Sequence, residues 1–312
     1  MQSKRNVIVG THNGIFHSDE VVACAIIKLM VEKLYPLQRS VEVIRTRDLN
    51  VLNNECDYVV DVGGGKFDHH QKGGNGQRAD GTKYASAGLV WKAFGYVILQ
   101  DDLPISQVNE AFNLIDENVI KKVDMEDNGE LTSEHVFSYI KNFLPNWDER
   151  NPNYDRAFNE VLEVTSKVLS SVISKNISIV KGKNEINNWL NCPITKIGNV
   201  LFLPAQTIEW LEPVVNFNIE NPDAAVDFVI FPYPDGGYAM QCVPKSLEEK
   251  FSQRITLPSS WAGETVNLPE ISNVKSAIFC HPARFFARAI DFNDIITMCE
   301  IATLENEKFR KI

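Results

Sequence analysis

Four of the six histidines lie in two short clusters with carboxylate residues, and each cluster begins where an apolar, strand-like run ends. The first cluster contains His12, His17 and Asp19, and the second contains Asp61, Asp68, His69 and His70. Mixed imidazole and carboxylate ligands suit transition-metal ions such as Mn²⁺ or Zn²⁺ better than Ca²⁺, which prefers oxygen ligands throughout. The clusters offer more ligands than one tetrahedral ion takes, so they predict a site for two divalent ions. Hydrolysis of phosphate esters is typical of such sites.

The first cluster is expected on a loop that leaves a strand and enters a helix. Spacings of five and two residues separate His12, His17 and Asp19, and Asn13-Gly14 permits a tight turn between the histidines. Side chains on such a loop can converge on an ion. Asp19 would equally suit the first turn of the helix, where a carboxylate stabilises the helix N-terminus. The sequence leaves both roles open.

The second cluster follows a short apolar run at residues 58–60, so a buried strand would bring the Asp61 carboxylate to the edge of a sheet. A carboxylate in that position is costly unless it meets a cation. Three glycines at 63–65 then bend the chain before His69 and His70. Adjacent histidines project in different directions, so one could bind metal while the other contacts a substrate phosphate. The alternative is an ordinary surface pair.

A further carboxylate could come from the acidic segment VDMEDNG, which ends in an Asn-Gly turn. Asp124 and Asp127 are both candidates to complete the second ion's ligands, and the residues leave the choice open. Both would otherwise be acidic residues at an ordinary helix end.

Basic residues near the clusters, and others far away in the chain, are candidates for contacting substrate. They are Arg45, Arg47, Lys72, His281 and Arg288, with Arg284 as a candidate catalytic side chain. Arg45 and Arg47 end a strand, where a planar guanidinium suits a phosphate. Lys72 lies in a glycine-rich loop that could approach phosphate closely or be only flexible surface. His281 and Arg284 could close a cleft from a second domain, or Arg284 and Arg288 could form a solvent-exposed i, i+4 helix face.

The elements expected along the first half alternate between strands and helices. Strands are expected at 6–10, 41–46 and 57–63, and helices at 19–35, 85–94 and 105–119. This alternation favours a mostly parallel sheet covered by helices, and ligands of such sheets gather beyond the carboxyl ends of the strands. A long helix is expected from 153 to about 174. Short strands follow at 200–204, 225–237, 238–244 and 276–280, with Pro-Asp-Gly-Gly as a hairpin turn.

The predicted fold class is α/β, with a mostly parallel-sheet N-terminal domain joined by a helix to a smaller α+β C-terminal domain. A chain of 312 residues exceeds the size at which single cores usually stop growing. We expect a metal-binding catalytic domain at 1–150, a helical linker at 151–190 and a substrate-binding domain at 191–312. The active-site cleft would lie between the two domains.

The composition is acidic, with a formal charge of −10, which argues against broad, non-specific coating of nucleic acid or anionic membrane. Six scattered cysteines without a C-x-x-C pair fit a reducing compartment. No apolar stretch is long enough to span a bilayer, and no signal or transit peptide is evident before the first strand. We expect a soluble intracellular protein with no membrane partner. Cytoplasm, nucleus and mitochondrion stay open, as does the oligomeric state.

Taken together, these motifs resemble a known group of hydrolases. Asp68-His69-His70 and the segments THNGIFHSDEVVA, VIRTRD, DYVVDVGGGKFDHHQKG, YASAGLVW, VDMEDNG and QCVP, with the strand into His281, resemble the DHH phosphoesterase superfamily and, more closely, the Myg-type proteins. The resemblance covers most of the chain. It implies a DHH-type N-terminal domain with two bound Mn²⁺ or Mg²⁺ ions, and Myg-type proteins are linked to 3′→5′ RNA exonuclease activity.

The resemblance also implies a role for each matching residue. His12 and His17 would hold one ion, Asp19, His69 and Asp127 the second, with Asp61 as the bridge and His70 at the scissile phosphate. His17 stands where many superfamily members have aspartate. After His281 the chain has PARFFAR in place of the glycine-rich run usual in Myg-type proteins, so Arg284 is expected to replace a backbone phosphate cradle as a side-chain clamp.

The function predicted from the sequence is a two-metal phosphodiesterase, a 3′→5′ exoribonuclease that acts with Mn²⁺, or alternatively Mg²⁺, on RNA or a short oligonucleotide. One alternative is a small-molecule phosphatase, pyrophosphatase or nucleotide phosphoesterase built on the same site. The acidic charge favours that alternative, because a long polyanion would be repelled. A second alternative is a non-catalytic RNA-binding scaffold that keeps the metal residues for stability.

Overall fold

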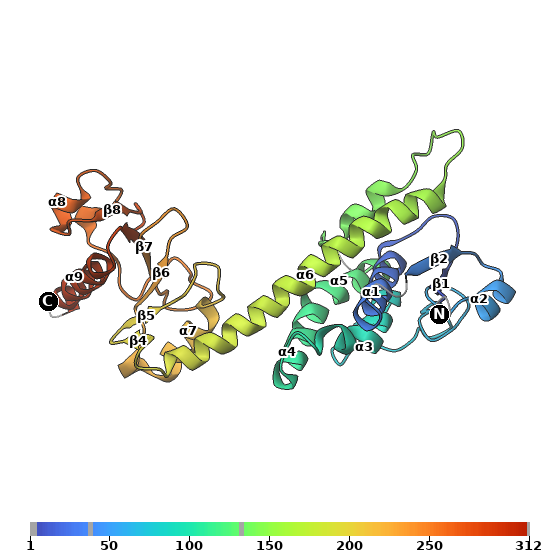
Figure 1. The fold of residues 1–312 in the computed structure, drawn as a ribbon, viewed down its shortest axis with the longest axis horizontal. Coiled ribbons are helices and arrows are strands. Elements are labelled where there is room, and N and C mark those ends of the chain that lie inside the picture. Colours follow the sequence, from blue (N-terminus) through green and yellow to red (C-terminus); the bar gives the residue numbers. More distant parts are fainter. Residues whose placement is uncertain (1–4, 37–39, 131–133, 311–312) are drawn as a thin grey trace. The chain divides into compact units, whose positions relative to one another are not determined.

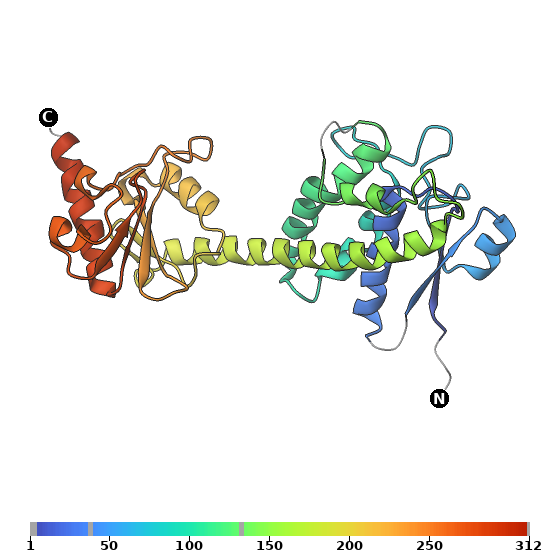
Figure 2. The ribbon, with the colours of Figure 1, turned by 90° about the horizontal axis from the view of Figure 1, so that it is seen from above.

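The computed structural model describes residues 5–36, 40–130 and 134–310 of the chain. It divides into two compact units, Met1–Val180 and Lys181–Ile312, and the long helix α6 (Tyr154–Leu190) contributes residues to both (Figures 1 and 2). The predicted domain roles, their boundaries and the cleft between domains stay predictions. Among the described residues, no helix is both long enough and apolar enough to cross a membrane.

The first unit contains a three-stranded parallel sheet in the order β2-β1-β3, with bounds Val41–Arg45, Val7–Thr11 and Tyr58–Val59. The strands predicted at 6–10 and 41–46 are confirmed, and their register pairs Val9 with Val43. The third strand is shorter than predicted. Asp61 (φ 58°) and Gly63 (φ 83°) take the backbone into the left-handed region, which ends the pairing. Because the strands are parallel, β1 and β3 end at the same edge of the sheet.

Helices accompany this sheet. They are α1 (Ser18–Leu34), α2 (Leu49–Glu55), α3 (Ser86–Leu99), α4 (Ile105–Ile115), the π-helix η1 (Asp116–Ile120), α5 (Lys121–Asp127) and the 3₁₀ helix η2 (Ser138–Phe143). The predicted helices at 19–35 and 85–94 are confirmed, and α1 packs along α3 with Val22, Ile26 and Trp91 fully buried. The helix predicted at 105–119 continues through η1 and α5 to Asp127. A π-turn inside a helix often lies near a functional site, and α5 carries the acidic segment singled out above.

The second unit contains a six-stranded mixed sheet in the order β4-β5-β6-β7-β9-β8. The strands are β4 (Lys196–Ile197), β5 (Val200–Phe202), β6 (Phe228–Pro232), β7 (Tyr238–Cys242), β8 (Ala277–Cys280) and β9 (Phe286–Ala289). The accompanying helices are α7 (Leu211–Glu220), η3 (Pro222–Ala224), η4 (Ser259–Trp261), α8 (Leu268–Ser272) and α9 (Phe292–Arg310). Met240 belongs to one hydrophobic core and Val229 to another. Met240 on β7 pairs with Ile230 on β6, the residue after Val229, and successive side chains of a strand point to opposite faces. The two cores therefore lie on opposite faces of the sheet.

Two sequence predictions in this unit have clear outcomes. The hairpin at Pro-Asp-Gly-Gly is confirmed: it joins β6 to β7, and the Tyr233 N–H donates to the Gly237 carbonyl over 3.0 Å. The alternative of a helix face formed by Arg284 and Arg288 is wrong. These residues belong to the antiparallel hairpin of β8 and β9, in which Arg284 has a φ of 58° at the turn. The α/β class itself is confirmed as a mixed α/β structure.

Candidate metal centre

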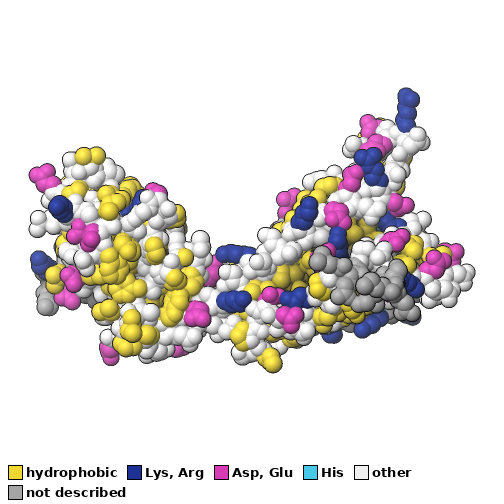
Figure 3. Space-filling view, in the orientation of Figure 1, with side chains coloured by type: hydrophobic (Ala, Val, Ile, Leu, Met, Phe, Trp, Pro, Cys, Tyr) yellow, Lys and Arg dark blue, Asp and Glu magenta, His cyan; other side chains and the backbone are white. Residues whose placement is uncertain are grey.

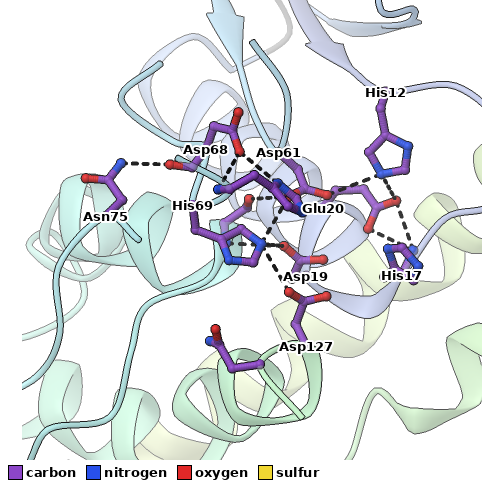
Figure 4. Close-up of polar contacts among 12 residues, drawn as sticks. His12, His17, Asp19, Glu20, Asp61, Asp68, His69, Asn75 and Asp127 are labelled. Atoms are coloured by element: carbon purple, nitrogen blue, oxygen red, sulfur yellow. Dashed lines mark hydrogen bonds and ion pairs between the residues drawn. The ribbon is translucent and has the colours of Figure 1, made fainter. Parts of the chain in front are cut away.

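Asp61 lies at the centre of the cluster of predicted ligands (Figure 4). It follows β3, and its side chain is buried. Its Oδ2 lies 3.2 Å from His12 Nε2, whereas its Oδ1 lies 3.3 Å from His69 Nε2 and 3.4 Å from His70 Nδ1. The Ser86 hydroxyl also donates to Oδ1 over 3.1 Å. The two oxygens of one carboxylate therefore face imidazoles that come from different segments of the chain.

Glu20 joins the cluster beside His12, and the sequence analysis missed it. Its carboxylate accepts the backbone N–H of His17 over 2.9 and 2.8 Å, and its Oε1 lies 3.1 Å from His12 Nε2. His17 is the N-cap of α1 and Glu20 is the third residue of the helix, which is the spacing of a capping box. That spacing was the available signal, because a glutamate there folds back over the helix N-terminus toward the loop that carries His12.

Asp19, His69 and Asp127 meet on the other side of Asp61. His69 Nε2 lies 3.1 Å from Asp127 Oδ2 and 3.7 Å from Asp19 Oδ2. Asp19 is fully buried, and its Oδ2 accepts the Ser86 N–H at the start of α3 over 3.2 Å. Its Oδ1 is also buried and has no hydrogen-bond partner among the residues that the structure describes. An unpartnered buried carboxylate oxygen beside an imidazole is an environment that a bound cation would complete.

Asp124, the alternative to Asp127, is held by other partners. It is buried, accepts the Gly88 N–H over 2.8 Å and lies 2.7 Å from Arg78 Nη1. Arg78 also donates to both oxygens of Asp116 over 2.7 Å. Burial raises the pKa of Asp124 to about 7, against the opposing effect of Arg78. Of the two candidates, Asp127 is therefore the one whose carboxylate meets the histidines.

Three overlapping groups of side chains in the described part of the chain could hold a metal ion. They are His12, His17, Glu20 and Asp61; Asp61, His69 and His70; and His17, Asp19 and Asp127, each with ligand atoms within 4.8 Å of one another. Asp61 belongs to the first two groups, and His17 to the first and third. The structure thus brings all six residues predicted as ligands into one cluster able to bind metal. The identity and number of the ions stay predictions.

Carboxylates dominate the charge of this cluster. Burial, followed by the charges of Asp61 and Glu20, raises the pKa of Asp19 well above its ordinary range. Burial alone would lower the pKa of His12, but hydrogen bonds to the neighbouring carboxylates raise it to about 10. The same balance raises the pKa of His69 to about 10. The imidazole protons offset part of the carboxylate charge, so a divalent ion would bind here in exchange for protons. The donor set fits such an ion.

Two pockets adjoin the cluster, and His17 and His70 line both. The first, which we call the Arg47 pocket, has a volume of about 480 Å³ and includes Asp61 and Arg47 in its lining. The second, the Lys141 pocket, has a volume of about 410 Å³, and its lining includes Phe16, Asp127, Lys141 and Leu144. Lys72 is exposed, and neither lining includes it. Of the predicted substrate contacts in the first unit, Arg47 is the one beside the metal cluster.

The guanidinium of Arg45, a predicted substrate contact, is engaged by partners within the protein. Its side chain is only 3% exposed, and it donates to the Gly14 carbonyl and to Asp155, both over 2.8 Å. The guanidinium carbon also lies 4.6 Å from the ring centre of Phe158 and 5.6 Å from that of Phe16. Its partners inside the protein engage most of this group, and a role for Arg45 toward substrate stays a prediction.

The other predicted substrate contacts lie in the second unit. The Arg288 guanidinium pairs with Asp235 at 2.6 Å and lies 3.8 Å from the ring centre of Tyr233. Arg284 makes a long hydrogen bond of 3.4 Å to the Leu257 carbonyl. His281 Nδ1 accepts the N–H of Ala283 over 3.0 Å within the hairpin turn. The roles of His281, Arg284 and Arg288 toward substrate stay predictions.

Comparisons with known proteins identify relatives along almost the whole chain. The family MYG1_exonuc, described as "Uncharacterised protein family (UPF0160)", matches residues 8–303. The MYG1 exonuclease of Rattus norvegicus is 29% identical over 310 residues, which cover 89% of this chain and 79% of the rat protein. The MYG1 exonuclease of Homo sapiens is 28% identical over 312 residues, with 89% and 80% covered. The MYG1 protein of Chlamydia muridarum (strain MoPn / Nigg) is 29% identical over 296 residues, with 92% of each chain covered.

These relationships support a hydrolase that acts on phosphoester bonds. The resemblance to Myg-type proteins is confirmed, whereas placement in the DHH superfamily stays a prediction. The matched residues include both metal-ligand clusters and the β8–β9 hairpin. On this evidence of near-complete coverage, the chain belongs to the MYG1_exonuc family.

Proposed function

We propose that this protein is a two-metal phosphodiesterase that removes nucleotides from the 3′ end of RNA. The observation that carries the proposal is the position of Asp61, whose Oδ2 lies 3.2 Å from His12 and whose Oδ1 lies 3.3 Å from His69. A carboxylate whose two oxygens lie next to different imidazoles is suited to bridge two ions. Two-metal hydrolases hold their ions about 3.5–4 Å apart. The names of the mammalian relatives, MYG1 exonuclease, support a nucleic acid substrate.

Each ion would have its own set of ligands around the shared carboxylate. His12, His17 and Asp61 would hold the first, with Glu20 beside them, and Asp19, Asp61, His69 and Asp127 would hold the second. Imidazoles mixed with carboxylates favour Mn²⁺, and Mg²⁺ is the alternative. When bound, two such ions supply Lewis acidity for the attack of water on a phosphodiester.

His70 is the side chain that we assign to the scissile phosphate. It lines both pockets and is 62% exposed, and its Nδ1 lies 2.9 Å from Asp68 Oδ1. The Asp68 carboxylate makes Nδ1 the donor of that hydrogen bond, which leaves Nε2 to face a substrate. Arg47 lines one of the same pockets and would add a planar cation for a phosphate.

The proposal extends to the second unit, to which we assign substrate binding. Arg284 lies at the β8–β9 turn beside His281, and its long hydrogen bond to Leu257, 3.4 Å, leaves most of its donors for a phosphate. We also propose that the protein acts inside the cell. All six cysteines are free thiols, as a reducing compartment would keep them.

The test combines metal analysis with labelled substrates. Protein stripped of metal and reloaded with Mn²⁺ should contain two ions per chain and should shorten a 5′-labelled oligoribonucleotide stepwise from its 3′ end. A DNA strand of the same sequence measures the preference for RNA. Degradation from the 5′ end would overturn the direction. Turnover of pyrophosphate or dinucleotides alone would favour a small-molecule phosphatase, and two bound ions without any turnover would favour the scaffold.

A further inference from the structure

Trp147 is almost fully exposed, unlike the other four tryptophans. Its exposed fraction is 96%, whereas Trp91, Trp210 and Trp261 are buried and Trp189 is half-buried. An indole in this position contributes nothing to the hydrophobic core. Its flat face is instead available to a flat partner, and stacked aromatic pairs gain more than their buried area alone provides.

The loop that carries Trp147 holds the indole outward. It connects η2 to α6 and stands away from the helices just before α6 begins (Figure 1), and residues 146–153 are exposed. The Glu149 N–H donates to the Asn146 carbonyl over 3.1 Å, and the Asn146 N–H donates to the Glu149 carboxylate over 3.1 Å. Trp147 therefore sits within a closed, hydrogen-bonded turn, which lowers the entropy lost when a partner binds.

The same segment lines a pocket of the metal centre. Lys141 and Leu144 line the Lys141 pocket together with His70 and Asp127. Trp147 follows Leu144 by three residues, a stretch that spans at most about 11 Å. The Lys141 side chain is 59% exposed, and its ion pair with Glu134 is long, at 3.9 Å. The Lys141 cation and the Trp147 indole therefore lie on one short segment, six residues apart, next to the pocket that contains Asp127.

We propose that Trp147 is a stacking platform for a nucleobase of the RNA substrate, near the nucleotide whose phosphate lies at the metal cluster, while Lys141 contacts a phosphate between them. This subsite rests on the proposed function and adds base binding to it. Every nucleobase has a π face, so the platform accepts any sequence. On the face drawn in Figure 3, Lys, Arg, Asp and Glu are interspersed without a broad basic area. A chain with a charge of −10 therefore needs another way to hold a polyanion, and base stacking would provide it.

An exposed tryptophan can also anchor a protein at a membrane interface. Binding to an anionic membrane surface requires an excess of lysines or arginines around the indole, whereas Asp148 and Glu149, which directly follow Trp147, outnumber Arg150. A base stacks through its uncharged face, and the cation for its phosphate comes from Lys141 in the pocket. The surroundings of the indole therefore favour a nucleotide over a lipid surface.

Tryptophan fluorescence reports binding at this subsite directly. Because the other four tryptophans are buried or half-buried, Trp147 should give most of the emission that acrylamide quenches. We expect a short oligoribonucleotide to quench this emission in the full-length, metal-free protein, where no turnover occurs. An abasic strand of the same length should not quench it. Trp147→Phe should lose the signal and keep most of the affinity, whereas Trp147→Ala should bind about 5- to 150-fold more weakly.

The matched control is Ile105→Ala, which removes another exposed apolar side chain of the same unit, 88% exposed, and should leave affinity unchanged. Absence of quenching, or equal affinity of Trp147→Ala and the unaltered protein, would overturn the subsite. Quenching by phosphatidylserine vesicles in place of RNA would overturn it in favour of a membrane contact. Binding is measured without hydrolysis, so the subsite can stand if the proposed exonuclease activity fails. Conversely, RNA hydrolysis with an unchanged KM in Trp147→Ala would remove the subsite alone.

Discussion

Replacement of Asp61 by asparagine is the most direct perturbation of the metal centre. Asparagine keeps the shape of the side chain and tolerates the left-handed backbone of this residue, φ 58°, whereas alanine there would add about 1–2 kcal/mol of strain. The change removes a charge that lies 3.2 Å from His12 and 3.3 Å from His69. We therefore expect Asp61→Asn to lose divalent-ion binding while the fold is retained.

The size of the effect follows from ligand linkage and from the size of the first unit. A divalent ion at 100 times its dissociation constant stabilises a protein by about 2.7 kcal/mol. For a unit such as Met1–Val180, each bound ion should raise the melting temperature by roughly 5–11 °C. Differential scanning fluorimetry with Mn²⁺ should show this shift in the unaltered protein but less than about 2 °C in Asp61→Asn. Turnover should fall at least about 100-fold, because several kcal/mol of charge stabilisation are lost.

The matched control is Asp101→Asn, which removes an exposed carboxylate of the same unit, 67% exposed, and should keep the full shift. Circular dichroism of the metal-free proteins separates loss of binding from loss of folding. If Asp61→Asn keeps both the Mn²⁺-induced shift and turnover within a few-fold of the unaltered protein, Asp61 does not bridge the ions.

Three further predictions concern proton linkage, packing and charge. The pKa of His12 and that of His69 are raised to about 10 in the fold, so their protonated forms stabilise the metal-free protein fully below the unfolded value of 6.5. Melting curves of metal-free protein should therefore shift to lower temperature as pH rises toward 10, and excess Mn²⁺ should reverse this slope. Gly88→Ala would place Cβ 1.9 Å from a buried carboxylate oxygen and should cost about 3 kcal/mol by denaturant unfolding, whereas Gly65→Ala meets open space and should cost little. Lys141→Ala should reduce the slope of log affinity against log salt by about 0.7, measured by anisotropy with a labelled oligoribonucleotide.

Each of these predictions has an outcome that contradicts it. A metal-free melting temperature that rises between pH 7 and 10 would show that the imidazoles are neutral in the fold. Equal unfolding free energies for the two glycine variants would remove the packing argument. A salt slope unchanged by Lys141→Ala would mean that this lysine meets no phosphate.

The candidate metal cluster could be predicted from the sequence because the segments before its predicted ligands have recognisable local patterns. Apolar runs precede His12 and Asp61, and the corresponding strands β1 and β3 are parallel neighbours that pair Gly10 with Val59. Residues that follow both strands consequently meet at one edge of the sheet. This local logic does not extend to Glu20, whose place beside His12 depends on how the N-terminus of α1 is capped.

Choices that depended on distant partners could not be made from the sequence. Asp124 and Asp127 lie three residues apart on one helix, and the residue that separates their roles, Arg78, comes from a loop far away in the chain. Arg45 resembled a phosphate ligand at a strand end. It is buried because Phe158 and Asp155, at the start of α6, cover and pair with it. Neither of these long-range contacts can be predicted from the sequence around Asp124 or Arg45.

The end of α6 was predicted too early for a related reason. Serines, asparagines and Gly182 between residues 174 and 184 lower the helix propensity, so the pattern indicated an end near 174. The helix nevertheless continues to Leu190, and Val180, Ile186 and Leu190 are buried in hydrophobic clusters. Tertiary packing stabilises this stretch where intrinsic propensity does not.

Two adjacent carboxylates in the first turn of α1, those of Asp19 and Glu20, lie beside different histidines of the candidate metal centre. Glu20 lies 3.1 Å from His12, whereas Asp19 lies 3.7 Å from His69. Residues 21–27 of the same helix have no exposed surface, so packing in the hydrophobic core holds α1 in place. The groups proposed to contact substrate lie instead on exposed loops and on η2. The candidate metal ligands on α1 are thus tied to the hydrophobic core, whereas the groups proposed to contact substrate are not.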